Sequence, residues 1–131
     1  MSQSSKESQL QSNNKGYHRL ILWQKGREFI KLIYKGTENF PRSEILGLQS
    51  QIRRAAISYL LNIVEGHRRK SQKDFLKFLN IAEASLTEVE ACLEIALDLE
   101  FISEQVYEEL ESKRKELAIM TRAFVKGVQN S

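Results

Sequence analysis

The centre of the chain reads LQSQIRRAAISYLLNIVEG over residues 48–66, with apolar side chains at every third or fourth position. This period is that of an α-helix, in which 100° separates successive residues, and not the alternation of a strand. Gly66 favours a helix end, because glycine readily adopts the left-handed conformation that follows many helices. We therefore predict a helix that starts between Pro41 and Glu44 and ends at Gly66, with a core-facing stripe of Leu48, Ile52, Ala55, Ala56, Tyr59 and Ile63.

A second apolar arc runs along the same predicted helix. Its members are Leu46, Ile57, Leu60, Leu61 and Val64. A helix of a monomeric bundle needs only one apolar side, and large exposed apolar patches usually mark association surfaces. We predict that this arc is the oligomer interface; the alternative is that neighbouring helices of the same subunit cover both arcs.

A polar stripe separates the two arcs, and it consists of Gly47, Gln51, Arg54, Ser58, Asn62 and Glu65. Arg53 lies instead at the edge of the second arc, where its stem can pack while its guanidinium reaches water, a carboxylate or a phosphate. The alternative role of Arg54 and Glu65 is that of solvent-exposed charges, and that of Asn62 is a hydrogen bond near the helix end.

Three more helices are expected around this one, over residues 19–38, 71–100 and about 104–129. Gly36 is an alternative end of the first, and Ser71 can cap the third. The last helix carries an inward stripe of Val106, Leu110, Leu117, Phe124 and Val128.

Long helices joined by short connections must fold back on one another. The 131 residues include only six Gly and one Pro, so few turns are available. We therefore predict an all-α fold, an antiparallel up-down-up-down four-helix bundle over residues 17–128. Residues 1–16 are almost entirely polar and are expected to form a disordered tail.

The net charge of +3 hides a strong sorting of charge along the chain. Residues 15–37 hold six Lys or Arg and one acid, residues 42–73 seven and two, residues 74–111 one and eleven, and residues 112–131 five and one. The basic cluster of Arg68, Arg69, Lys70 and Lys73 falls in a loop and the following helix start. Such a cluster can contact the phosphates of a nucleic acid, although similar clusters occur on helical proteins that bind nothing.

An acidic line on the third predicted helix complements this cluster. It aligns Glu83, Glu90, Glu94 and Asp98 with Thr87, and no basic residue shares its face. The line is expected to be solvated; the alternative is that it meets a basic surface on another helix or another subunit.

Residues for catalysis or metal binding are sparse. The two histidines, His18 and His67, lie outside any Glu-x-x-His motif, and the sequence has no Gly-x-x-x-x-Gly-Lys loop. The single cysteine, Cys92, cannot form an internal disulfide and suits a reducing cytosol. We expect a cytoplasmic protein that is not an enzyme, without a cofactor, a metal, a targeting segment or a membrane span.

Several short motifs occur in an order that resembles a known family. They include residues 22–25, Phe40-Pro41, residues 51–58, residues 62–66, residues 78–82 and residues 101–103. Over about residues 17–125 the chain resembles the four-helix-bundle family of 23S ribosomal RNA intervening-sequence proteins. It departs from the family pattern at Leu60, where members commonly have proline, and the shape of the second helix is expected to differ there.

The resemblance implies a bacterial bundle that assembles into a homo-oligomeric ring, typically a pentamer. The family is also similar to the accessory variability proteins of diversity-generating retroelements, which bind nucleic acid and associate with a reverse transcriptase. That similarity implies nucleic-acid contacts at Arg53, Arg54 and residues 68–70. The alternative is a protein-protein interaction scaffold that binds no nucleic acid and uses its basic regions for solubility or subunit pairing.

Overall fold

The computed structural model describes residues 16–131. Of the tail predicted for residues 1–16, residues 1–15 lie outside this range, and Gly16 begins the first helical turn. Within it the elements are all helical: the short 3-10 helices η1 (Gly16–Arg19) and η2 (Arg42–Glu44) and the four long helices α2 (Ile21–Gly36), α3 (Leu48–His67), α4 (Gln72–Asp98) and α5 (Glu104–Gln129). The predicted all-α class and the four helices are confirmed. None of the helices in this part of the chain is long and apolar enough to cross a membrane.

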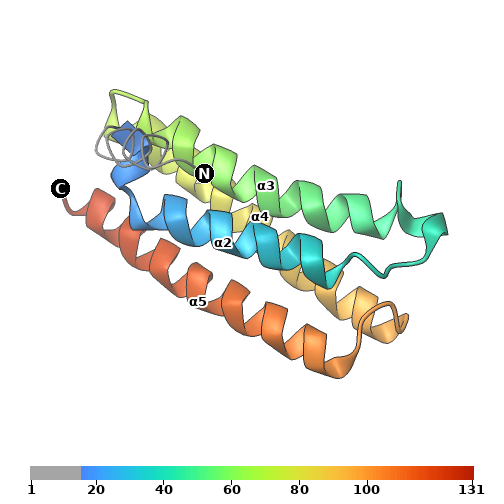
Figure 1. The fold of residues 1–131 in the computed structure, drawn as a ribbon. Helices are drawn as coiled ribbons and strands as arrows, with labels where there is room; N and C mark the ends of the chain where they lie inside the picture. The colour runs from blue at the N-terminus through green and yellow to red at the C-terminus, as the bar shows by residue number, and fades with distance from the viewer. Residues whose placement is uncertain (1–15) are drawn as a thin grey trace, which may run out of the picture.

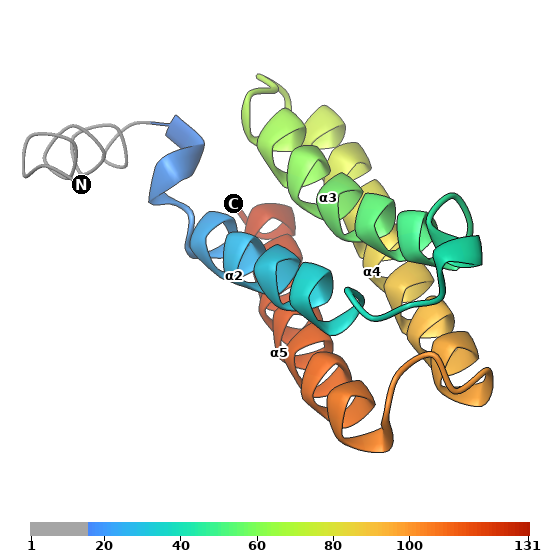
Figure 2. The same ribbon diagram turned by 45° about the vertical axis from the view of Figure 1, so that its right-hand side comes forward.

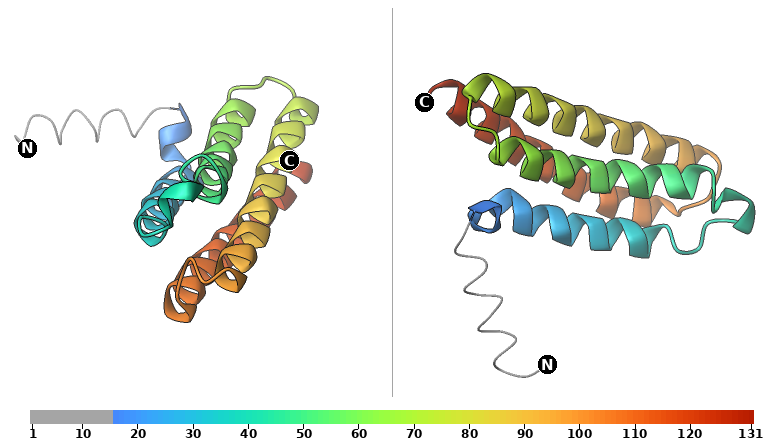
Figure 3. Two further views of the ribbon diagram at one scale, coloured as in Figure 1. Left: turned by 90° about the vertical axis from the view of Figure 1, so that its right-hand side faces the viewer. Right: turned by 90° about the horizontal axis from the view of Figure 1, so that it is seen from above.

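The four long helices lie side by side and form a four-helix bundle (Figure 1). The connections over residues 37–47 and 99–103 lie at one end, and the connection over residues 68–71 lies at the other end, near the C-terminus (Figure 1). Turned views show α3 beside α4 and α2 beside α5 (Figures 2 and 3). Each helix therefore has two neighbours and one outward side.

The core stripe predicted on α3 is confirmed. Ile52, Ala55, Ala56, Tyr59 and Ile63 are buried, and Leu48 is half-buried. They meet the apolar side of α4, where Leu79, Ala82, Leu86, Val89, Leu93 and Ala96 are buried. Burial of this apolar area is the main favourable contribution to folding.

The start of α3 lies later than predicted. Residues 42–44 form η2, and α3 begins only at Leu48. The Glu44 carboxylate accepts a hydrogen bond from the Leu48 backbone N–H at 3.0 Å and so satisfies a donor of the first turn. Because the Glu44 side chain caps this N–H, α3 begins at Leu48.

The second apolar arc of α3 is divided between the core and the surface. Leu60 is only 3% exposed, whereas Leu61 is 59% exposed; Ile57 and Val64 are half-buried. Leu46 precedes the first residue of α3 and is 94% exposed, so it does not belong to the arc on this helix. Leu60 is buried because α2 presents Gly26 to it: a Cβ added at Gly26 would lie 2.6 Å from Leu60 Cδ1. Leu60 was predicted to line the oligomer interface, and the structure corrects this by placing it inside the subunit.

Helix α5 has a more polar inner side than predicted. Its buried residues are Leu110, Arg114, Leu117, Thr121 and Val125, while Val106, Phe124 and Val128 are half-buried. Thr121 is acceptable there because its hydroxyl bonds the Leu117 carbonyl at 2.7 Å and the Tyr59 hydroxyl at 2.7 Å. Burial raises the pKa of the Tyr59 phenol well above its ordinary value, although the bond with Thr121 acts in the opposite direction.

Leu60→Ala is expected to lower the free energy of unfolding by about 2–5 kcal/mol, because it leaves a cavity against Gly26. The measurement is urea unfolding followed by circular dichroism. Leu46→Ala removes the same atoms from an exposed position and serves as the matched control, with an expected change within about 0.5 kcal/mol. Equal effects of the two substitutions would contradict the assignment of Leu60 to the core.

Tyr59→Phe is expected to cost about 0.5–1.5 kcal/mol at pH 7, because it removes a buried hydrogen bond. It should also change the response to alkaline pH. Folding raises the Tyr59 pKa above its unfolded value near 10, so the unfolded state releases this proton first and stability falls as pH rises beyond that value. Urea unfolding between pH 8 and pH 11 should show a shallower decrease of stability for the Phe variant; parallel curves would contradict this prediction.

Candidate nucleic-acid interface

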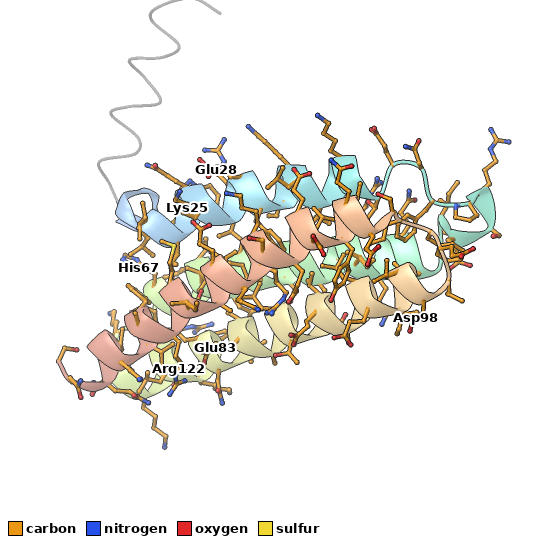
Figure 4. The ribbon with its side chains drawn as sticks, turned by 90° about the horizontal axis from the view of Figure 1, so that it is seen from below. Lys25, Glu28, His67, Glu83, Asp98 and Arg122 are labelled. Atoms are coloured by element: carbon orange, nitrogen blue, oxygen red, sulfur yellow. The ribbon has the colours of Figure 1, made fainter. Side chains whose placement is uncertain are left out.

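Four basic residues surround the connection between α3 and α4: Arg68, Arg69, Lys70 and Lys73. This surface is called the basic end below. Helix α3 ends at His67, and Ser71 caps α4 by accepting a hydrogen bond from the Asp74 backbone N–H at 3.1 Å. All four basic residues are exposed. Figure 4 shows His67 at this end of the bundle and Asp98 at the opposite end. The fold thus brings the predicted cluster together on one surface.

The basic residues differ in how they are held. The Arg69 guanidinium pairs with Glu65 and lies over the Phe78 ring, 4.7 Å from its centroid. Arg68 approaches the same carboxylate at 3.9 Å, with its side chain 71% exposed. Within residues 16–131, Lys70 and Lys73 form no ion pair. Arg69 is therefore oriented by the protein, while Arg68 and the two lysines remain available to an anion.

Three more basic residues, which the sequence pattern did not single out, lie near this surface. Lys77 and Arg122 line a shallow groove of about 250 Å³ between α4 and α5, together with Leu76, Asn80, Glu83, Val125 and Gln129. Lys126 follows Arg122 by one turn of α5, as Lys77 follows Lys73 on α4. The sequence shows the four-residue spacing between Lys73 and Lys77 and between Arg122 and Lys126. Only the fold shows that these two pairs lie on adjacent helices.

Arg53 has a structural role at the end of α2. Its Nε donates to the Thr37 hydroxyl at 3.0 Å, one of its terminal nitrogens donates to the Tyr34 carbonyl at 3.1 Å, and the guanidinium lies 4.3 Å from the Tyr34 ring centroid. Gln49 donates to the Thr37 carbonyl at 2.9 Å. A cation at a helix C-terminus is favourable, because the last carbonyls are unpaired and carry partial negative charge.

Arg54 is exposed and lies on the outward side of α3, away from this arrangement. It forms no ion pair with any other described residue. Arg53 and Arg54 are thus neighbours in sequence with different surroundings, and neither belongs to the basic end. Their contacts with nucleic acid stay a prediction.

The acidic line of α4 is partly paired with α5. Glu83 and Arg122 approach to 3.1 Å and lie beside each other in Figure 4. Glu90 accepts from Arg114 at 3.1 Å, and Arg114 also donates to Glu111 at 2.9 Å. The hydrogen bonds with Glu111 raise the pKa of Arg114 and keep this buried guanidinium charged.

Only the rest of the acidic line is solvated as expected. Glu94 and Asp98 are exposed, and Asp98 lies at the end of the bundle opposite the basic end (Figure 4). The bundle therefore has a basic end and an acidic end, and the pairing of Glu83 and Glu90 reduces the charge between them.

Cys92 is buried in α4, and burial, with a smaller contribution from Glu88, raises the pKa of its thiol. A thiol with a raised pKa is a poor nucleophile, since the thiolate is the reactive form. In the part of the chain that the structure describes, no three His, Cys, Asp or Glu residues are grouped so as to hold a metal ion.

Two comparisons with known proteins find similar proteins. Residues 18–123 match the family model described as 23S rRNA-intervening sequence protein. The chain is also similar to a crystal structure from Bacteroides thetaiotaomicron, of a protein with unknown function from the S23 ribosomal protein family, with 28% sequence identity and a TM-score of 0.72. That similarity covers 81% of this chain and 99% of the other. A search of the curated proteins finds no match.

Arg53→Ala is expected to lower the free energy of unfolding by about 1–3 kcal/mol, because it removes two hydrogen bonds from a charged donor and the stacking on Tyr34. Arg42→Ala removes the same charge from an exposed position and should change stability by less than about 0.5 kcal/mol. Urea unfolding measures both. Equal stability of the two variants would show that Arg53 does not hold the end of α2.

Proposed function

The chain belongs to the family of 23S rRNA-intervening sequence proteins, and on that premise we propose that it is a non-enzymatic protein that binds RNA or DNA through its basic end. The observation that supports this proposal is the group of exposed Arg68, Lys70 and Lys73 beside a preoriented Arg69. Phosphate oxygens suit such a surface, because lysine and arginine release the condensed counterions of a nucleic acid when they bind it.

The separation of charge along the bundle supports the same function. The basic end attracts a polyanion and the acidic end repels it, so the field of the protein orients an approaching nucleic acid. Nothing in this arrangement reads base edges, and contacts with phosphates carry no sequence information. The proposed binding is therefore sensitive to salt and weakly sequence-specific.

The proposed assembly is a homo-oligomeric ring of antiparallel up-down-up-down bundles, a pentamer as the family resemblance implies. The exposed Leu61, with half-buried Ile57 and Val64 on either side of it, supports an association surface on α3. A ring repeats the basic end in every subunit, and such multivalency makes a modest patch effective. Ribosomal RNA or a retroelement with its reverse transcriptase is the proposed setting, in the cytoplasm of a bacterium.

The triple variant Arg68→Ala/Lys70→Ala/Lys73→Ala is expected to bind RNA at least tenfold more weakly at 50 mM salt. Fluorescence anisotropy of a labelled single-stranded ribosomal RNA fragment measures the affinity. The slope of log affinity against log salt should become shallower by about 0.7 for each phosphate that the variant no longer neutralises.

The matched control is Lys31→Ala/Lys35→Ala/Lys115→Ala, which removes the same charge from exposed positions on α2 and α5. It should bind RNA within about twofold of the unaltered protein. Equal weakening in both triple variants would reduce the proposal to a non-specific charge effect and overturn the basic end as the site. Absence of RNA binding at low salt would favour the interaction scaffold.

A further inference from the structure

Helices α3 and α4 each carry an outward row of residues with alternating steps of three and four. The α3 row is Arg54, Ile57, Leu61 and Val64, and Arg68, the C-cap residue just after α3, continues it. The α4 row is Lys77, Ile81, Ala84, Glu88, Ala91 and Ile95. Leu61, Ile81 and Ile95 are exposed although they are large and apolar. Apolar residues at alternating steps of three and four form the contact seam between helices that pack side by side, as in coiled coils.

The two rows carry complementary charge. Glu88 forms no ion pair within residues 16–131, whereas Glu83 and Glu90 of the same helix are paired with α5. Arg54 is equally unpaired in the described part of the chain. Each row thus has an apolar section with one unpaired charge at its side, Arg54 on α3 and Glu88 on α4. Lys77 begins the α4 row at the basic end as a second unpaired charge among the described residues.

A hydrogen bond between the two helices fixes the heights of these charges along the bundle. The Ser58 and Ser85 hydroxyls are 3.1 Å apart, so these residues lie at one level. The chain turns back between the two helices at residues 68–71 (Figure 1), so that residues before Ser58 and residues after Ser85 lie on the same side of this level. Arg54 lies four residues before Ser58, and Glu88 lies three residues after Ser85. At about 1.5 Å of rise per residue, the two charges differ in height by about 1.5 Å.

The apolar residues match in the same way on the other side of this level. Leu61 lies three residues from Ser58, and Ile81 lies four residues from Ser85. A second copy placed beside the first at the same height therefore brings Arg54 opposite Glu88 and Leu61 opposite Ile81.

We propose that the α3 row of one copy packs on the α4 row of the next copy. This inference rests on the proposed ring and names the two faces that form it. Pairing of unlike faces leaves one face free on each copy, and such a heterologous contact generates a ring when the rotation closes. Pairing of like faces at one height is disfavoured, because it sets Arg54 against Arg54 or Glu88 against Glu88. An inverted pairing of two α4 rows sets Lys77 against Glu88 instead, and Arg54→Glu would leave that pairing intact.

The contact makes the nucleic-acid site composite. Arg68, at the end of the α3 row, lies ten residues after Ser58. Phe75 of α4 lies ten residues before Ser85, so Arg68 and Phe75 are at the same height along the bundle. That level falls between Lys73 and Lys77 of α4. Arg68 of one copy thus comes close to Lys73 and Lys77 of the neighbouring copy, and a bound phosphate relieves the repulsion among them. Nucleic-acid binding and assembly then strengthen each other, since coupling between two binding events is reciprocal.

A charge exchange tests the contact. Arg54→Glu and Glu88→Arg are each expected to weaken assembly at least tenfold, measured by light scattering and sedimentation, and the double variant is expected to restore it. Both positions are exposed, and circular dichroism checks that the helix content is unchanged. Single variants that keep the full assembly mass, or a double variant no better than the singles, would overturn the proposal.

Cross-linking between separate copies tests the register. Leu61→Cys protein mixed with Ile81→Cys protein should give a disulfide-linked dimer under mild oxidation, and neither protein alone should do so. Ile119→Cys is the matched control, because Ile119 is 66% exposed on α5 and lies on neither row. Cys92 is buried and does not compete. Equal cross-linking of Leu61→Cys with both partners would overturn the register.

The RNA assay separates this inference from the proposed function. Lys77→Ala is expected to lower RNA affinity severalfold, with Lys31→Ala as the control, and RNA should raise the affinity between subunits. Restored assembly in the charge exchange, together with full RNA binding by Arg68→Ala/Lys70→Ala/Lys73→Ala, would retain the contact and overturn the function. Loss of RNA binding in that triple variant without rescue in the charge exchange would retain the function and overturn the contact.

Discussion

The close approach of α2 to α3 at Gly26 determines which surface of the bundle is left uncovered. Leu60 fills the space that a side chain at position 26 would need, so α2 covers one edge of the second apolar arc of α3. On the opposite side, α4 packs against α3, and the Ser58–Ser85 hydrogen bond joins the two helices at that edge. Both neighbours are then fixed, and Leu61 is left between them on the outside. The outward row of α3 is the result of these two contacts.

Sequence periodicity predicted the helices and the core stripe because both depend on neighbours in the chain. The direction of a side chain around its own helix follows from 100° per residue, and Ile52, Tyr59 and Ile63 lie where that rule places them. The fate of Leu60 could not be predicted in this way, because it depends on a glycine more than thirty residues earlier. The start of α3 differs from the prediction for a local reason that periodicity does not carry, since the Glu44 side chain caps a helix that begins four residues later.

The candidate site was predictable where its residues are consecutive and not where they come from separate helices. Arg68, Arg69 and Lys70 form a cluster in any fold that exposes residues 68–70. Arg53 and Arg54 read alike in sequence, yet one holds the end of α2 and the other is exposed, because only Arg53 is directed toward Tyr34 and Thr37. Opposite charges on separate helices also cancel in a way that counts along the chain do not reveal, as the pairing of Glu90 with the buried Arg114 illustrates.

The charges that stay unpaired after folding matter more for function than the total of each segment. Within the described residues, ion pairs with α5 offset the charges of Glu83 and Glu90, whereas Glu88 on the outward side of α4 is unpaired. An unpaired carboxylate beside exposed isoleucines costs little in water and gains most when a cation reaches it as the apolar surface is covered. Arg54 can be that cation, because it is unpaired among the described residues and lies in the apolar row on the outward side of α3. Since Arg68 continues the same row to the basic end, the side chains that join two copies and those that meet a phosphate form one continuous surface, and a change in either function is expected to alter the other.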